Sequence, residues 1–145
     1  MKRFALLLCL LIGLLLAACT AGDQDNVTVE EAWGRPSPKS AANAAFYMAI
    51  NNSSREDDTL TKASLDICGR TELHLSAIDD EGVMSMQQVQ QIDIPAGESV
   101  VLEPGGLHVM CIDRQTELNS GDRLPITLSF AHAGEMAVEA EIRDQ

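Results

Sequence analysis

Hydrophobic and polar positions alternate over short stretches of the chain after residue 26, and many of the apolar positions are β-branched. Successive side chains of a strand point to opposite faces, so a period of two predicts strands with one buried face. The stretches that predict strands are 27–33, 45–51, 60–67, 72–78, 83–92, 99–102, 107–112, 124–131 and 136–142. Turn residues separate them, and the alanine-rich segment 40–45 is the one place where helix propensity competes. Seven to nine short strands predict a single all-β domain, a sandwich or barrel.

The amino terminus has the pattern of an export signal. Lys2 and Arg3 precede an apolar run over 4–16, which is short for a transmembrane helix and typical of a secretory leader. The run ends in Leu16-Ala17-Ala18-Cys19, which resembles the lipobox of bacterial lipoproteins. That resemblance implies a leader over 1–18, a lipid on Cys19, a lipidated tether over 19–26 and a folded domain over 27–145. Ordinary cleavage with a free Cys19 is the alternative.

The residue after the lipobox cysteine bears on the destination of such a protein. It is Thr20 rather than Asp, and by the sorting tendency of bacterial lipoproteins this favours the outer membrane. We therefore expect a periplasmic, membrane-anchored lipoprotein.

The net charge of the chain limits which classes of molecule can be its partners. Ten Lys and Arg face 22 Asp and Glu, a formal net charge of −12, and removal of the leader leaves 8 − 22 = −14. Such a surface repels nucleic acid, and one Trp, one Tyr and three Phe offer no stacking platform for bases. It attracts cations or basic protein faces.

The remaining cysteines fit an exported protein. Cys9 leaves with the leader and Cys19 takes the lipid, so Cys68 and Cys111 are the thiols of the folded part. An even pair in an oxidising compartment predicts a structural disulfide, which would place their strands side by side. Thiol–disulfide chemistry by this pair is the alternative, although the spacing is unlike a Cys-x-x-Cys motif.

Histidine and methionine are concentrated in the middle of the chain, on predicted strands. Side chains two apart share a face of a strand, so His108 and Met110 point the same way, as do Met84 and Met86. His74 lies on a further strand. Imidazole and thioether suit the soft ion copper(I), whereas calcium and magnesium require oxygen ligands. A thioether also binds without losing a proton.

These residue types also have ordinary structural roles. Methionine fills cores, and a lone histidine in a strand is commonly hydrogen-bonded structure. We expect Met48 and Met136 to be core residues and His132 a turn or surface residue. For Met84 both roles are open.

Several motifs resemble the periplasmic copper chaperones of the PCu(A)C type. They are Ala32-Trp33-Gly34-Arg35, Asn43-Ala44-Ala45-Phe46-Tyr47-Met48, Glu72-Leu73-His74, Gly82-Val83-Met84-Ser85-Met86, Ile94-Pro95-Ala96-Gly97, Leu102-Glu103-Pro104-Gly105-Gly106-Leu107-His108-Val109-Met110 and Leu124-Pro125-Ile126-Thr127-Leu128. The family's metal signature is a His, ten residues, a Met, twenty-one residues and then His-x-Met. Met86 and His108 have the twenty-one intervening residues, but His74 and Met86 have eleven rather than ten.

This resemblance implies a cupredoxin-like Greek-key β-sandwich or barrel that binds copper(I) through His74, Met86, His108 and Met110. The loop at 79–82 would have to absorb the extra residue; otherwise His74 would change faces. Met84 is the competing ligand for Met86. Extra oxygen ligands for copper(II) are an open alternative.

For function, the resemblance implies delivery of copper to cytochrome c oxidase together with a Sco-type assembly factor. A copper buffer without a dedicated acceptor and an inert structural lipoprotein are the other hypotheses. The sequence lacks a Gly-x-Ser-x-Gly elbow, a His-Glu-x-x-His helix and a phosphate-binding loop, so we expect a binding protein rather than an enzyme.

Overall fold

The computed structural model describes residues 27–79 and 81–144. The predicted leader, the predicted acylation site Cys19 and the predicted tether up to residue 26 lie outside the described residues. Within the described part of the chain, no helix is long and apolar enough to cross a membrane.

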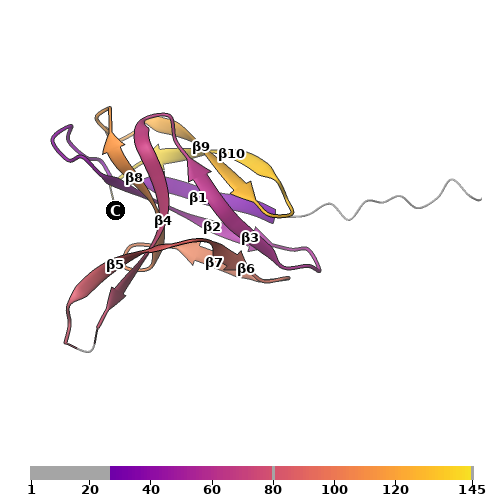
Figure 1. The fold of residues 1–145 in the computed structure, drawn as a ribbon. Coiled ribbons are helices and arrows are strands. Elements are labelled where there is room, and N and C mark those ends of the chain that lie inside the picture. The colour runs from indigo at the N-terminus through magenta and orange to yellow at the C-terminus, as the bar shows by residue number, and fades with distance from the viewer. Residues whose placement is uncertain (1–26, 80, 145) are drawn as a thin grey trace, which may run out of the picture.

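The predicted all-β fold is confirmed, with strands where the alternating pattern places them (Figure 1). They are β1 Val27–Gly34, β2 Ala44–Asn52, β3 Asp58–Ser64, β4 Cys68–Ile78, β5 Met84–Val89, β6 Ile92–Ile94, β7 Ser99–Leu102, β8 Leu107–Arg114, β9 Arg123–Phe130 and β10 Glu135–Ile142. They form one ten-stranded sheet in the order β5-β4-β8-β2-β1-β10-β9-β3-β6, and β7 pairs with β2. β1 and β10 are parallel neighbours, so the end of β10 lies beside Gly34 at the end of β1.

One sequence-based expectation for the strands was wrong. The stretch 83–92 forms two strands: β5 pairs with β4 at one end of the sheet order, and β6 pairs with β3 at the other. The competing helix propensity of segment 40–45 does not produce a helix, since Ala44 and Ala45 belong to β2 and pair with Cys111 and Met110 of β8. Ladder pairing overrides the weak helix propensity of a short alanine-rich segment.

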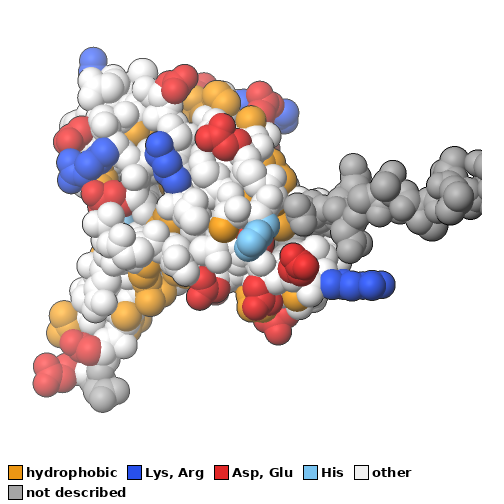
Figure 2. Space-filling view, turned by 45° about the vertical axis from the view of Figure 1, so that its right-hand side comes forward, with side chains coloured by type: hydrophobic (Ala, Val, Ile, Leu, Met, Phe, Trp, Pro, Cys, Tyr) orange, Lys and Arg blue, Asp and Glu red, His pale blue; other side chains and the backbone are white. Residues whose placement is uncertain are grey.

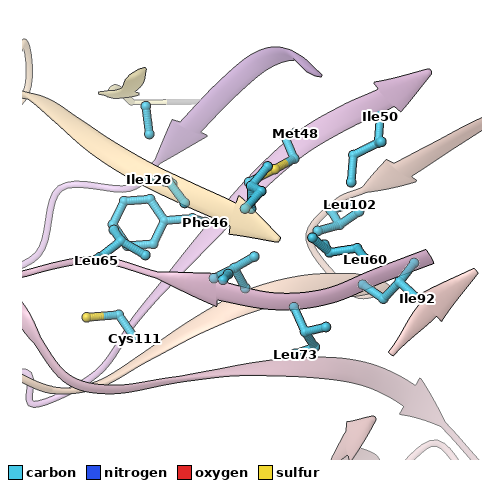
Figure 3. Close-up of a cluster of buried hydrophobic side chains, with 14 of the residues drawn as sticks. Phe46, Met48, Ile50, Leu60, Leu65, Leu73, Ile92, Leu102, Cys111 and Ile126 are labelled. Carbon is cyan, nitrogen blue, oxygen red and sulfur yellow. The ribbon is translucent and has the colours of Figure 1, made fainter. Parts of the chain in front are cut away.

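The core lies on one face of β2, β4 and β8. Phe46 of β2 and Leu73 of β4 pack in one cluster with Leu60 of β3 and Ile126 of β9, from the other half of the sheet order (Figure 3). The sheet must therefore curl so that its two halves face each other, as in a sandwich. Each of these side chains is at most 4% exposed, and burying one contributes roughly 1.5–3 kcal/mol. The opposite face of β2, β4 and β8 does not take part in this core.

The hairpin of β4 and β5 projects from the body of the domain (Figure 1). β5 is an edge strand, and its first five residues are exposed. Hydrophobic side chains follow this arm, with acidic side chains near its end (Figure 2). Among them, Ile78 is 64% exposed and Val83 is 57% exposed.

Candidate metal centre

Three neighbouring strands bring the four candidate ligands to one face of the sheet. His74 of β4 is directly opposite His108 of β8, and their ring centroids lie 5.7 Å apart. Met110 of β8 is opposite Glu72 of β4, and Met86 of β5 is opposite Ser76 of β4. Directly paired residues share a face, and so do residues two apart along a strand. His74, Met86, His108 and Met110 therefore point to the same side, away from the face that carries Leu73.

The hairpin register shows where the extra residue between His74 and Met86 lies. Ile78 pairs with Met84, so the five residues 79–83 form the connection and the pairing on either side is regular. The Asp79 carboxylate accepts hydrogen bonds from the backbone N–H groups of Glu81 (3.0 Å) and Val83 (2.8 Å), which stabilises this longer turn. His74 therefore stays on the face of Met86.

The same register separates the two competing methionines of β5. Met86 lies opposite Ser76, one same-face step from His74, whereas Met84 lies opposite Ile78, two steps away. Each step is about 7 Å along a strand. Met86 is thus the thioether closer to the histidine pair.

His108 is held in one orientation by the turn before it. Its Nδ1 lies 3.0 Å from the carbonyl oxygen of Gly106, which also accepts the backbone N–H of Ser76 at 3.0 Å. A carbonyl only accepts, so Nδ1 carries the proton and the lone pair of a neutral ring is on Nε2. The side chain is buried, at 3% exposure, so this orientation is fixed by packing as well.

His74 has the complementary arrangement. Its Nε2 lies 2.8 Å from Oε2 of Glu72, and its Nδ1 is buried without a hydrogen-bond partner. The hydrogen bond from His74, followed by that from Arg70, holds the pKa of Glu72 below its usual range, so the carboxylate accepts and Nε2 donates. The unpartnered Nδ1 then bears a lone pair. A carboxylate that orients an imidazole with one free nitrogen is the common outer shell of a metal ligand.

A row of aromatic rings continues this face into the body of the domain. Trp33 of β1 pairs with Tyr47 of β2, with ring centroids 4.7 Å apart, and the Tyr47 ring lies 6.3 Å from that of His108. Burial raises the pKa of Tyr47, and the nearby charge of Arg35 partly offsets this effect. The guanidinium of Arg143 lies 5.3 Å from the Trp33 ring. Trp33 and Tyr47 therefore extend the row of rings from His108 toward β1.

A β-bulge in β1 is what turns Trp33 toward this face. The pairing with β2 shifts by one residue between Glu30 and Trp33, and Glu31 has a φ of 51°. Without the shift Trp33 would be opposite Phe46, on the core face. Sequence reasoning missed the position of Trp33 for this reason, and it did not single out Tyr47 of β2. It also missed Glu72, although its position two residues before His74 was a usable signal.

The types of side chain present favour a soft metal. Among the described residues, no group of three or more His, Cys, Asp and Glu side chains could hold a metal ion. The site has two imidazoles and two thioethers instead, a set that suits copper(I) better than zinc or calcium.

The two cysteines of the domain are bonded to each other. The Cys68 and Cys111 sulfurs lie 2.01 Å apart, which links β4 to β8 next to Met110. Cys111 is fully buried, so the pair is placed as a structural bridge rather than an exposed redox centre.

Three further predictions concern single residues outside the site. Met48 is 1% exposed and Met136 packs against the core, as expected of core residues, and His132 is exposed in a bend.

Comparison with known proteins gives both sequence and structural relatives. The family described as "Putative lipoprotein LpqE-like" matches residues 27–142. An uncharacterized protein of Rickettsia prowazekii is 32% identical over 102 residues, which cover 68% of this chain and 56% of the relative, so the chain matches little more than half of that protein's length. A protein of Leifsonia xyli subsp. xyli named "Putative lipoprotein Lxx21020" is 28% identical over 130 residues, 88% of this chain and 76% of its own length.

Solved structures with a similar fold include PCuAC domains and DR1885. The apo PCuAC domain from PmoF1 has a TM-score of 0.72 at 28% identity, covering 85% of this chain and 98% of that domain. The copper(I) form of DR1885 from Deinococcus radiodurans has a TM-score of 0.66 at 29% identity, covering 88% and 85% of the two chains. The chain therefore belongs to the LpqE-like family, and its folded part is a single cupredoxin-like β-sandwich domain of the PCuAC copper chaperone type.

Proposed function

We propose that this domain binds one copper(I) ion through His74 Nδ1, His108 Nε2 and the thioethers of Met86 and Met110, and carries it to an acceptor. The observation that supports this most directly is the histidine pair. In each ring, one nitrogen forms a hydrogen bond and the other has a free lone pair. The thioethers of Met86 and Met110 lie on the same face of the sheet. A relative with the same fold, at 29% identity, is named as a copper(I) form.

The four ligands fit transport better than catalysis. A thioether has no proton to lose, so copper(I) can enter or leave without proton release at Met86 or Met110. Met86 is 55% exposed, which lets an incoming ligand reach the ion from the hairpin side. Among residues 27–79 and 81–144, we identify no pair of nucleophile and base beside the site.

The acceptor that we propose is the assembly pathway of cytochrome c oxidase, with a Sco-type factor as the immediate partner. Its support is the resemblance of the ligand motif to that of the PCu(A)C chaperones. A lipid on Cys19 would hold the protein in the periplasm at a membrane. An outer-membrane anchor suits copper capture and relay, whereas an inner-membrane anchor would place the domain beside the oxidase.

The first test is a copper(I) titration of the soluble domain in competition with a chelator. The core described above lies wholly within residues 27–142, so a chain that lacks residues 1–19 keeps every element it needs. The test variant is Met86→Ala, His108→Ala, Met110→Ala, and the matched control is His132→Ala, Met136→Ala. Circular dichroism checks that both remain folded.

We expect equimolar binding by the wild type and the control, and loss of binding by the test variant. Equal binding by both variants would contradict the ligand assignment. Transfer of the ion to a purified Sco-type protein then separates a chaperone from a buffer, because a buffer without an acceptor would keep its copper.

A further inference from the structure

Exposure changes steadily across the candidate site. His108 is 3% exposed, the His74 side chain is 14% exposed, and Met86 is 55% exposed. One same-face position further along β5, Met84 is 57% exposed. A copper ion on the two imidazoles is therefore screened on the side of the domain body and open on the side of the hairpin. A ligand that removes the ion can therefore approach from the side of β5.

Met84 is the next soft donor on that path. Its backbone lies about 7 Å beyond Met86 on the same face, at the end of the hairpin ladder opposite Ile78. This distance leaves it outside the group that surrounds the histidine pair. It is nevertheless within reach of an ion on Met86, because two flexible thioether side chains can each move toward the other.

We infer that Met84 is a handover ligand, which takes copper(I) from Met86 during release and presents it at the hairpin to the acceptor. This inference rests on the proposed function. In the step, the bond from copper to the Met86 sulfur breaks as the bond to the Met84 sulfur forms. Copper remains copper(I), and no proton or electron moves. The acceptor's own soft donor then displaces Met84.

A handover ligand affects the rate of transfer and leaves the equilibrium affinity unchanged, because it binds the ion only on the way out. The critical variant is Met84→Leu, which keeps the apolar volume and removes the sulfur. Ile78→Ala is the matched control, since it removes exposed apolar surface directly across the ladder and leaves both thioethers in place.

The rate of copper(I) transfer is measured by stopped flow from the loaded domain to a synthetic peptide with a Cys-x-x-x-Cys motif. We expect Met84→Leu to slow transfer about tenfold, the effect of losing one modest transition-state contact. Its affinity should stay within about twofold of the wild type, as expected when no ground-state contact is lost. Ile78→Ala should transfer at the wild-type rate.

Three results would overturn the inference. Transfer by Met84→Leu at the wild-type rate would show that the sulfur has no part in release. A loss of affinity as large as that of Met86→Leu would make Met84 a resident ligand. Equal slowing by Ile78→Ala would assign the effect to apolar contact with the peptide. Failure of the wild type itself to bind copper(I) would instead contradict the proposed function.

Discussion

Replacing both Cys68 and Cys111 by alanine removes the covalent link between β4 and β8, the two strands that carry His74, His108 and Met110. The cysteines are 43 residues apart. A crosslink of this loop length lowers the entropy of the unfolded chain enough to stabilise the fold by about 4 kcal/mol at 25 °C. Alanine is the suitable replacement because Cys111 is fully buried, and serine would place an unpaired hydroxyl there.

The assay is urea unfolding of the soluble domain followed by circular dichroism. We expect the free energy of unfolding to fall by about 4 kcal/mol, a large part of the total for a small domain. Wild-type protein held in reductant is the control and should lose a similar amount. A loss below about 1 kcal/mol in both samples would show that the bridge does not constrain the unfolded chain as this reasoning requires.

Three other changes test the fold and the site. Gly34→Ala should cost about 1–3 kcal/mol in urea unfolding, since an added Cβ would lie 2.9 Å from the Phe46 ring; full stability would contradict that contact. Glu72→Gln should weaken copper(I) binding about tenfold to a hundredfold in chelator competition, because His74 loses its carboxylate partner; unchanged affinity would argue against Nδ1 ligation. Asp58→Asn should flatten the acid limb of a stability profile against pH, and an unchanged limb would contradict the role of this carboxylate.

The sign of the Asp58 effect follows from its surroundings. Burial alone would raise the pKa of this carboxyl, but hydrogen bonds from the backbone N–H groups of His132, Ala133 and Thr59 outweigh burial and hold it below its usual range. A lowered folded-state pKa stabilises the fold above the unfolded value of about 3.9. That contribution is lost as the pH falls through the lower folded-state value. The wild type should therefore lose stability below about pH 4 more steeply than Asp58→Asn.

Most strands could be predicted because hydrophobic and polar residues alternate along a strand when one of its faces is buried. The division between β5 and β6 could not, since Gln90 and Gln91 interrupt the stretch without a Gly or Pro. The chain leaves β4 there and crosses to β3, a change of partner set by tertiary packing rather than by local propensity.

The candidate metal site also has parts that the sequence could predict and parts that it could not. The shared face of His108 and Met110 follows from spacing within one strand. The relation of His74 to Met86 depends on the length of a turn, which only the Ile78–Met84 pairing shows. The position of Trp33 depends on the bulge at Glu31, where one added residue reverses a face and leaves no mark on the hydrophobic pattern.

The aromatic row also has a spectroscopic consequence. Trp33 is the single tryptophan of the chain, and it lies against Tyr47, whose ring is 6.3 Å from that of His108. The tryptophan emission of the protein therefore arises from one buried indole, 6% exposed, with the Tyr47 ring between it and the proposed ligand His108. An event at His108 that shifts the Tyr47 ring would change the intensity or wavelength of that emission. The domain thus has an intrinsic optical probe that requires no added label.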